Sequence, residues 1–126
     1  MTGFDAIHKV KNELDAMDIE LSGGIYEFSK PLDNNEDEYI EINVLALPEA
    51  VLQLANVNVN IYVKDIVVGT PDNGRLEKIH DDINSNLPIS RPSDNIHIFW
   101  NGMSILADTD NSRHYVNMRL LVVMLN

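Results

Sequence analysis

The chain has 126 residues, no cysteine and a formal net charge of −11 at neutral pH. This length fits a single domain over residues 1–126, and a hydrophobic fraction of 44% is enough for a core without metal or disulfide cross-links. The missing cysteines exclude disulfides and thiol chemistry and fit a cytoplasmic protein, while the acidity argues against direct binding of phosphate backbones or anionic membranes.

Residues 4–17 carry apolar side chains at spacings of three and four, which predicts a helix with one apolar stripe. Thr2 is placed to cap this helix, and Asp5 stands three residues later at the positive end of its dipole. A short strand over residues 25–28 and an alternating strand over residues 40–44 follow, separated by an acidic connector. We expect these two strands to form a hairpin with a long exposed tip.

The clearest strand lies over residues 57–63, after a short linking segment that begins at Pro48 and has room for one helical turn. Valine and isoleucine occupy every second position of the strand, and asparagine or tyrosine fills the positions between them. Side chains of a strand alternate between its faces, so one face is apolar. Asparagine is a poor strand former, and we expect the other face to meet water or a polar partner.

A second amphipathic helix is expected after this strand. Its apolar stripe consists of Leu76, Ile79, Ile83 and Leu87. Thr70 and Asn73 are both suited to begin the helix, because both residue types cap helices well. Pro88 ends it, since proline restricts the residue before it and has no N–H to donate.

Three further strands are expected near the C-terminus. Residues 96–100 alternate, with Trp100 on the face expected in the core, and Asn101-Gly102 is a turn signal that would fold them onto residues 104–107. A turn over residues 108–112 then leads into a long last strand, residues 114–124. Its end, residues 120–125, has no polar face, so we expect both faces to be covered, the second by another helix or another subunit. This apolar run is far shorter than the roughly 20 residues that span a bilayer.

Together these elements predict an α+β domain in the order α-β-β-β-α-β-β-β. Two helices, one N-terminal and one central, are expected to pack on a single mixed sheet of five or six strands, most of them antiparallel.

No catalytic motif accompanies this organisation. The four histidines, at positions 8, 80, 97 and 114, have no metal-ligand spacing, and structural or surface roles are favoured for all of them. The acidic segments at residues 33–38 and 108–111 lack the spacing of a calcium loop, and no serine lies in a nucleophile elbow. We therefore expect neither an enzyme nor a bound metal or cofactor.

The pattern Val57-Asn-Val-Asn-Ile-Tyr-Val-Lys-Asp65, the helix Leu76-Glu-Lys-Ile-His-Asp-Asp-Ile83 and the late strands resemble the tail terminator or tail-completion proteins of long-tailed bacteriophages. The resemblance covers residues 4–124. It implies a structural protein that forms a six-fold ring at the head-proximal end of the tail, with tail-tube and head–tail connector proteins as partners. It also implies assembly in the host cytoplasm and a final place in the virion, with no membrane and no sequence-specific nucleic acid bound.

The same resemblance implies two contact regions. One is the apolar end of the last strand, represented by Leu121 and Val123, as part of a subunit interface. The other is the long acidic loop, which would reach a ring neighbour or the tube and is expected to be dispensable for folding. Its residues are Asp33, Asn34, Asn35, Glu36, Asp37 and Glu38.

Two other functions stay open at this stage. One is a small enzyme or ligand-binding domain with a pocket between the sheet and the N-terminal helix, near Trp100, Tyr26 and His114. The other is an acidic adaptor that binds a basic partner.

Overall fold

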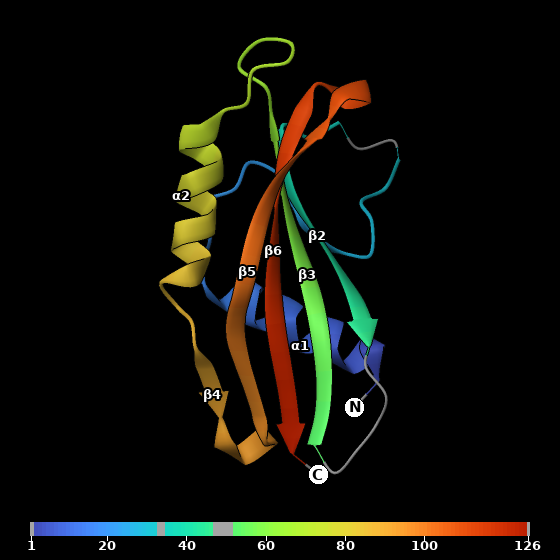
Figure 1. The fold of residues 1–126 in the computed structure, drawn as a ribbon, viewed down its shortest axis with the longest axis vertical. Helices are drawn as coiled ribbons and strands as arrows, with labels where there is room; N and C mark the ends of the chain where they lie inside the picture. The colour runs from blue at the N-terminus through green and yellow to red at the C-terminus, as the bar shows by residue number, and fades with distance from the viewer. Residues whose placement is uncertain (1, 33–34, 47–51, 126) are drawn as a thin grey trace.

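The computed structural model describes residues 2–32, 35–46 and 52–125. Within these ranges, two α-helices and one mixed sheet of six strands follow each other in the order α-β-β-β-α-β-β-β, which confirms the predicted α+β fold (Figure 1). The helices are α1 (Gly3–Ala16) and α2 (Asn73–Asn84). The strands are β1 (Ile25–Glu27), β2 (Glu38–Ala46), β3 (Leu52–Lys64), β4 (Ile89–Arg91), β5 (Ile96–Asp108) and β6 (Arg113–Leu125). The predicted linking segment at Pro48 lies outside the described residues.

The core lies between the two helices and one face of the sheet. The strand order is β1-β2-β3-β6-β5-β4, and the long strands β3 and β6 form its centre. Side chains at every second position of β2, β3, β5 and β6 form one buried cluster with the apolar stripes of both helices. Because one set of alternating positions contacts both helices, α1 and α2 cover the same face, and we call the opposite face the open face.

Both helices begin at polar N-cap residues, and the sequence correctly predicts the N-cap of α1 but not that of α2. Thr2 and Asp5 form a reciprocal capping box on α1, as expected. Helix α2 is capped by Asp72, which accepts a hydrogen bond from the Arg75 amide, rather than by Thr70 or Asn73. It ends at Asn84, before the expected end at Leu87. Among the described residues, no helix is long and apolar enough to cross a membrane.

The expected hairpin of the first two strands is wrong. Strand β1 pairs with β2 in parallel, with Ile25 opposite Ile40, and β2 instead forms its antiparallel partnership with β3. Phe28 ends β1 in a left-handed conformation, with φ of 70°, and the chain then returns to begin β2 beside the start of β1. Alternating polarity determines which face is buried but carries no information about strand direction, so the pattern could not distinguish the two arrangements.

The expected turn at Asn101-Gly102 is also wrong. Residues 96–108 form one continuous strand, β5, and the irregularity is a β-bulge between Trp100 and Met103 where Gly102 has φ of 106°. Strand β6 pairs with β5 on both sides of the bulge, so residues 101 and 102 interrupt β5 locally but do not form a turn between two strands. The sixth strand is β4, which pairs with residues 96–98 and which the sequence analysis did not identify.

Strand β6 is covered on one face only. Leu120 and Val122 are buried beneath the helices, whereas Leu121 and Val123 lie on the open face and stay partly exposed. Within the described residues no second helix covers the open face of β6, and its expected cover by another subunit stays a prediction. Trp100 was expected in the core but is 45% exposed, because α2 packs against β3 and β6 and leaves this part of β5 uncovered.

Candidate interaction site

Three groups of exposed apolar side chains lie at the edges and at one end of the sheet. The first lies at the edge of the sheet along β5, with Trp100, Met103 and Ile105. The second lies at the opposite edge, where Phe4 of α1 meets Phe28 after β1. The third is the loop between β3 and α2, residues 66–68, which protrudes at one end of the sheet (Figure 1). Contiguous exposed apolar surface of this kind is typical of interaction sites.

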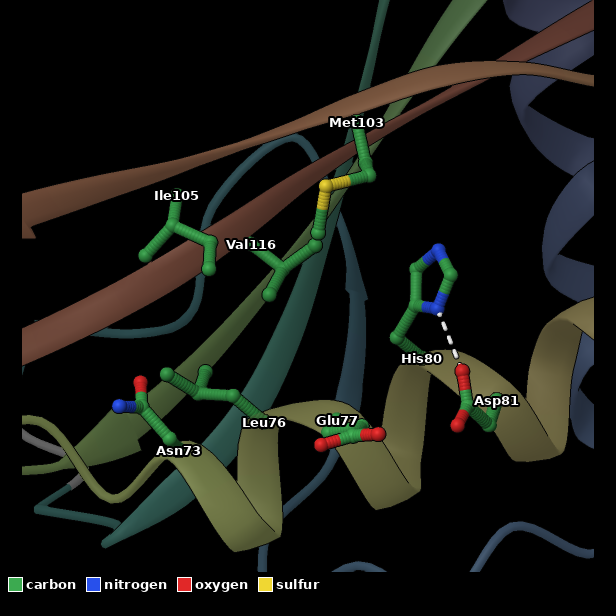
Figure 2. Close-up of a pocket in the computed structure, with 8 residues that line it drawn as sticks. All are labelled: Asn73, Leu76, Glu77, His80, Asp81, Met103, Ile105 and Val116. Carbon is green, nitrogen blue, oxygen red and sulfur yellow. Dashed lines mark hydrogen bonds and ion pairs between the residues drawn. The ribbon is translucent and has the colours of Figure 1, made fainter.

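The β5 edge is hollowed into a groove of about 430 Å³, which we call the α2–β5 groove. One wall is helix α2, which contributes Asn73, Leu76, Glu77, His80 and Asp81. The other wall and the floor are apolar and come from Met103, Ile105 and Val116, as Figure 2 shows. Ile105 is 52% exposed, so the groove presents apolar surface directly to solvent.

The bulge in β5 builds the apolar wall of this groove. Met103 follows Trp100 by three positions, and in a regular strand that spacing would place their side chains on opposite faces. The extra residue in the bulge restores the alternation, so that Trp100, Met103 and Ile105 pair with Leu120, Met118 and Val116 and share the helix-covered face. The Asn-Gly pair thus shapes the edge instead of reversing the chain.

The backbone of the same edge is unpaired over most of its length. β4 pairs only with residues 96–98 of β5, and within the described ranges no strand lies along residues 99–108 on that side. An open strand edge is a site at which another chain can add hydrogen bonds. The groove and the open edge therefore form one continuous surface.

The polar groups of the groove all come from α2. The His80 ring accepts a hydrogen bond from the Trp100 indole N–H at 3.3 Å through Nε2, while its Nδ1 lies 3.0 Å from Asp81 Oδ1. These contacts hold Trp100 at the rim beside His80. Glu77 and Asp81 are exposed, so the rim of the groove along α2 is acidic.

The second apolar place is an aromatic pair at the far edge of the sheet. The Phe4 and Phe28 rings meet edge to face, with centroids 5.7 Å apart, and the side chains are 62% and 46% exposed. Strands β2, β3 and β6 separate β1 from β5, so roughly 19 Å of sheet lies between the two edges. The aromatic pair and the groove are thus on opposite sides of one molecule.

The third place, the loop of residues 66–68, is held firmly despite its exposure. Asp65 is buried at its base, where its carboxylate lies 2.6 Å from His114 Nδ1 and accepts a hydrogen bond from the Gly69 amide at 3.2 Å. Two backbone hydrogen bonds between this loop and Thr70 close the turn. The result is a preorganised apolar tip in which Val68 is 87% exposed.

The open face of the sheet carries a polar and aromatic lattice. Asparagine side chains from β2, β3 and β6 hydrogen-bond to one another, among them Asn58 to Asn43 at 2.8 Å and Asn117 to Asn60 at 2.7 Å. Tyr39, Tyr62 and Tyr115 stack across the same three strands. Burial raises the pKa of Tyr62, so this phenol stays neutral. Within the described residues, no helix covers the open face. Its asparagines were expected to meet water or a polar partner, and many of them hydrogen-bond to one another.

The predicted contact residues Leu121 and Val123 lie on this open face, in β6. Leu121 pairs with Phe99 of β5, which is itself exposed, and Asn56 separates it from the exposed Leu45 of β2. Leu121 and Val123 therefore belong to a small apolar area on the open face, next to the hydrogen-bonded asparagines. Their role in a subunit contact stays a prediction.

The predicted acidic loop is not a free connector at its C-terminal end. Glu38 is the first residue of β2, and its carboxylate accepts hydrogen bonds from Arg75 Nε and Nη2 at 2.7 and 2.9 Å and from the Ser22 amide at 3.2 Å. The Arg75 hydrogen bonds lower the pKa of Glu38. Glu36 accepts a hydrogen bond from the Tyr26 hydroxyl at 2.6 Å.

These contacts change what is expected of that segment. Because Glu36 and Glu38 bind β1, α2 and the α1–β1 connection, removing residues 33–38 would cost stability, contrary to our expectation from the sequence. Asn35 and Asp37 are exposed, and Asp33 and Asn34 lie outside the described residues. No sequence pattern marked Arg75 as the partner of Glu38, because 37 residues separate them.

The pocket expected beneath α1 does not form around the residues proposed for it. Tyr26 lies on β1 and Trp100 on β5, with three strands between them, and His114 is engaged with Asp65. In the part of the chain that the structure describes, no three histidine, aspartate or glutamate side chains gather as a metal site.

No protein-family model matches the chain, and a search of curated proteins finds no match.

Proposed function

We propose that this protein is a structural assembly protein with the role of a phage tail terminator or tail-completion protein, forming a ring at the head-proximal end of the tail. The observation that carries the proposal is the distribution of exposed apolar surface over both sheet edges and one end of the molecule. A subunit that touches two ring neighbours and an axial partner needs separate contact surfaces of this kind.

Three further features support this role over an enzymatic one. The four histidines hydrogen-bond to separate sets of partners and do not converge on a common cleft among the described residues. The edge of β5 is open for backbone pairing. The preorganised loop at residues 66–68 offers an axial contact to the tail tube or to the head–tail connector, because it protrudes beyond the end of the sheet (Figure 1).

The first test is assembly of the purified full chain. Light scattering over a wide range of concentrations, combined with electron microscopy, should reveal closed rings, either of the protein alone or after addition of a tail-tube protein encoded beside it. Neighbouring tail-tube and head-connector genes are the expected genomic setting. A protein that stays monomeric under both conditions and does not bind the tube would contradict the proposal.

A second candidate function is favoured by the α2–β5 groove, whose volume lies in the range of small-ligand sites. In that case the rim carboxylates of Glu77 and Asp81 would select a ligand with a cationic group and an apolar body. A thermal-shift screen with amine-containing compounds distinguishes this candidate, since a ligand that binds only the folded state raises the melting temperature. Loss of that shift in Ile105→Asp would place the ligand in the groove.

A further inference from the structure

We propose that a pocket beside Arg113, at the start of β6, binds a small molecule through a single carboxylate group. This inference goes beyond the proposed assembly role, which uses the two sheet edges and the loop of residues 66–68. The pocket has a volume of about 400 Å³, within the range of small-ligand sites. It lies between the segment that follows β1, strand β2 and the start of β6, and Lys30, Tyr39, Glu41 and Arg113 are among its lining residues.

Arg113 is a buried cation that has no carboxylate partner in the described chain. The residue is only 8% exposed, and its guanidinium carbon lies 5.2 Å from the centre of the Tyr39 ring. Its Nη1 donates a hydrogen bond to the Asp37 carbonyl at 3.1 Å, and within residues 2–32, 35–46 and 52–125 neither Nε nor Nη2 has an acceptor. Arginine stays charged in proteins, and buried charges are normally paired. The guanidinium therefore requires an anionic partner from outside the described chain.

The unused donors of Arg113 match one class of ligand. The N–H groups of Nε and Nη2 form one edge of the planar guanidinium, and such a fork binds both oxygens of a carboxylate with two parallel hydrogen bonds. The Lys30 ammonium lies 5.3 Å from the centre of the same Tyr39 ring, so a second positive charge faces this pocket. Two cations thus meet at one place in a chain whose net charge is −11.

The acidic side chains nearest to Arg113 are bound to other groups. Glu41 lines the pocket, but its Oε2 accepts a hydrogen bond from the Lys30 amide at 2.8 Å. Asp108 lies opposite Arg113 in the pairing of β5 with β6, but both of its carboxylate oxygens accept hydrogen bonds from Asn111 Nδ2, at 3.1 and 3.2 Å. Neither carboxylate forms an ion pair with Arg113.

Two more acidic side chains lie in the connector that precedes β2. Glu36 accepts the hydrogen bond from the Tyr26 hydroxyl, and the Asp37 carboxylate is 70% exposed and lies 4.0 Å from Lys64 Nζ. Neither of them pairs with Arg113 in the part of the chain that the structure describes.

These acidic neighbours limit the charge that the pocket accepts. Burial raises the pKa of Tyr39, and the carboxylates of Glu41, Asp108 and Glu36 raise it further, which places all three within electrostatic reach of the pocket. A carboxylate adds one negative charge, whereas a phosphate group adds roughly 1.5 to 2 at pH 7 and would be repelled more strongly. A ligand with one carboxylate therefore fits the site better than a phosphorylated one.

Titration with matched pairs of small molecules tests the site in the full chain. Propionate and benzoate would be added at neutral pH and constant ionic strength, and propionamide and benzamide serve as their neutral counterparts. We expect saturable binding of at least one carboxylate, at least tenfold tighter than binding of its amide. The Arg113 Nε–H signal in a ¹H–¹⁵N NMR spectrum should shift on binding. The melting temperature gives a second readout, since a ligand that binds only the folded state raises it.

Two arginine variants locate the binding. Arg113→Met removes the guanidinium and should weaken carboxylate binding at least tenfold. Arg119→Met is the matched control, because Arg119 lies on the same strand and face but donates to Ser104 and Asn117 and does not line the pocket. Circular dichroism checks both folds. If Arg113→Met unfolds, Arg113→Lys replaces it and should show the same loss, because lysine keeps the charge but not the fork.

Four results would overturn this inference. The first is no saturable binding of either carboxylate to the native chain, and the second is an equal loss in Arg113→Met and Arg119→Met. The third is tighter binding of inorganic phosphate than of either carboxylate. The fourth is a tenfold gain in affinity in Asp33→Asn, which would show that a carboxylate of the chain itself fills the site. Ring assembly is measured separately, so failure of this site leaves the proposed function standing.

Discussion

Replacing Glu38 by glutamine tests the contact that joins the two halves of the fold. In the native chain this carboxylate binds Arg75 of α2 through two hydrogen bonds and the Ser22 amide through a third. Arg75 also donates to the Glu20 carbonyl at 3.1 Å. The pair thus fastens α2 and the α1–β1 connection to the first residue of β2. Glutamine keeps the size of the side chain but removes its charge.

The expected cost is about 2 kcal/mol of unfolding free energy. Hydrogen bonds to charged groups contribute about 1.5–3 kcal/mol, and exposed ion pairs about 0–1 kcal/mol. The Glu38 and Arg75 side chains are 13% and 27% exposed, so solvent screens this pair only in part and the cost lies in the lower part of the range for charged hydrogen bonds. For a domain of this size the loss corresponds to a melting temperature lower by about 6–10 °C.

The cost should depend on pH in one direction. Hydrogen bonds from Arg75 lower the pKa of Glu38 below its ordinary value of 4.5. A carboxyl group whose pKa is lower in the folded state stabilises the fold above its unfolded pKa, and this contribution is lost as the pH falls through the folded value. The stability difference between the native chain and Glu38→Gln should therefore be constant above 4.5 and shrink below it.

Urea unfolding followed by circular dichroism at about pH 7, 5 and 3 measures this difference. Asp82→Asn is the matched control, because Lys78 and Asp82 form an exposed pair at 2.9 Å on the same helix, for which we expect a much smaller loss. Equal costs for the two variants at neutral pH would refute the reasoning. A Glu38→Gln deficit that persists unchanged at pH 3 would do so as well.

Three other substitutions test local parts of the fold. Thr2→Ala removes the capping box of α1 and should cost about 1 kcal/mol in urea unfolding, with Thr2→Ser as the neutral control. Asp65→Asn should cost about 1–3 kcal/mol and speed hydrogen exchange at the Gly69 amide; unchanged exchange there would show that Asp65 does not hold the loop. Gly102→Ala places a side chain at φ of 106°, so we expect a loss of about 1–2 kcal/mol, and a neutral result would mean that the bulge relaxes freely.

Part of the fold could be predicted because periodicity reports burial directly. The stripe of α1, the alternating β3 and the long β6 were all assigned correctly, since each buries one face or one stripe in the core. Strand direction and pairing were not encoded in that pattern. The parallel pairing of β1 and the continuity of β5 through its bulge depend on which neighbouring strand offers free hydrogen-bonding groups.

The exposed apolar surfaces were harder to predict than the core. Leu121 and Val123 were predicted as contact residues from an apolar run without a polar face, and their role in a contact stays a prediction. The groove was not, because Met103 and Ile105 have the pattern of ordinary core positions, and only the placement of α2 over β3 and β6 leaves them exposed. The Phe4–Phe28 pair joins residues from two elements that sequence spacing does not relate.

By itself, the sequence determined the class of the fold, the order of its elements, the capping of α1 and the absence of cysteine chemistry. These properties depend on residue types and local spacing, which can be read directly from the linear sequence. Only the tertiary structure decided that Glu38 is an anchor for α2 rather than a loop tip, that β6 is covered on one face and that both edges of the sheet expose apolar side chains. Those properties depend on which segments far apart in the chain come to lie side by side, and local periodicity carries no record of that.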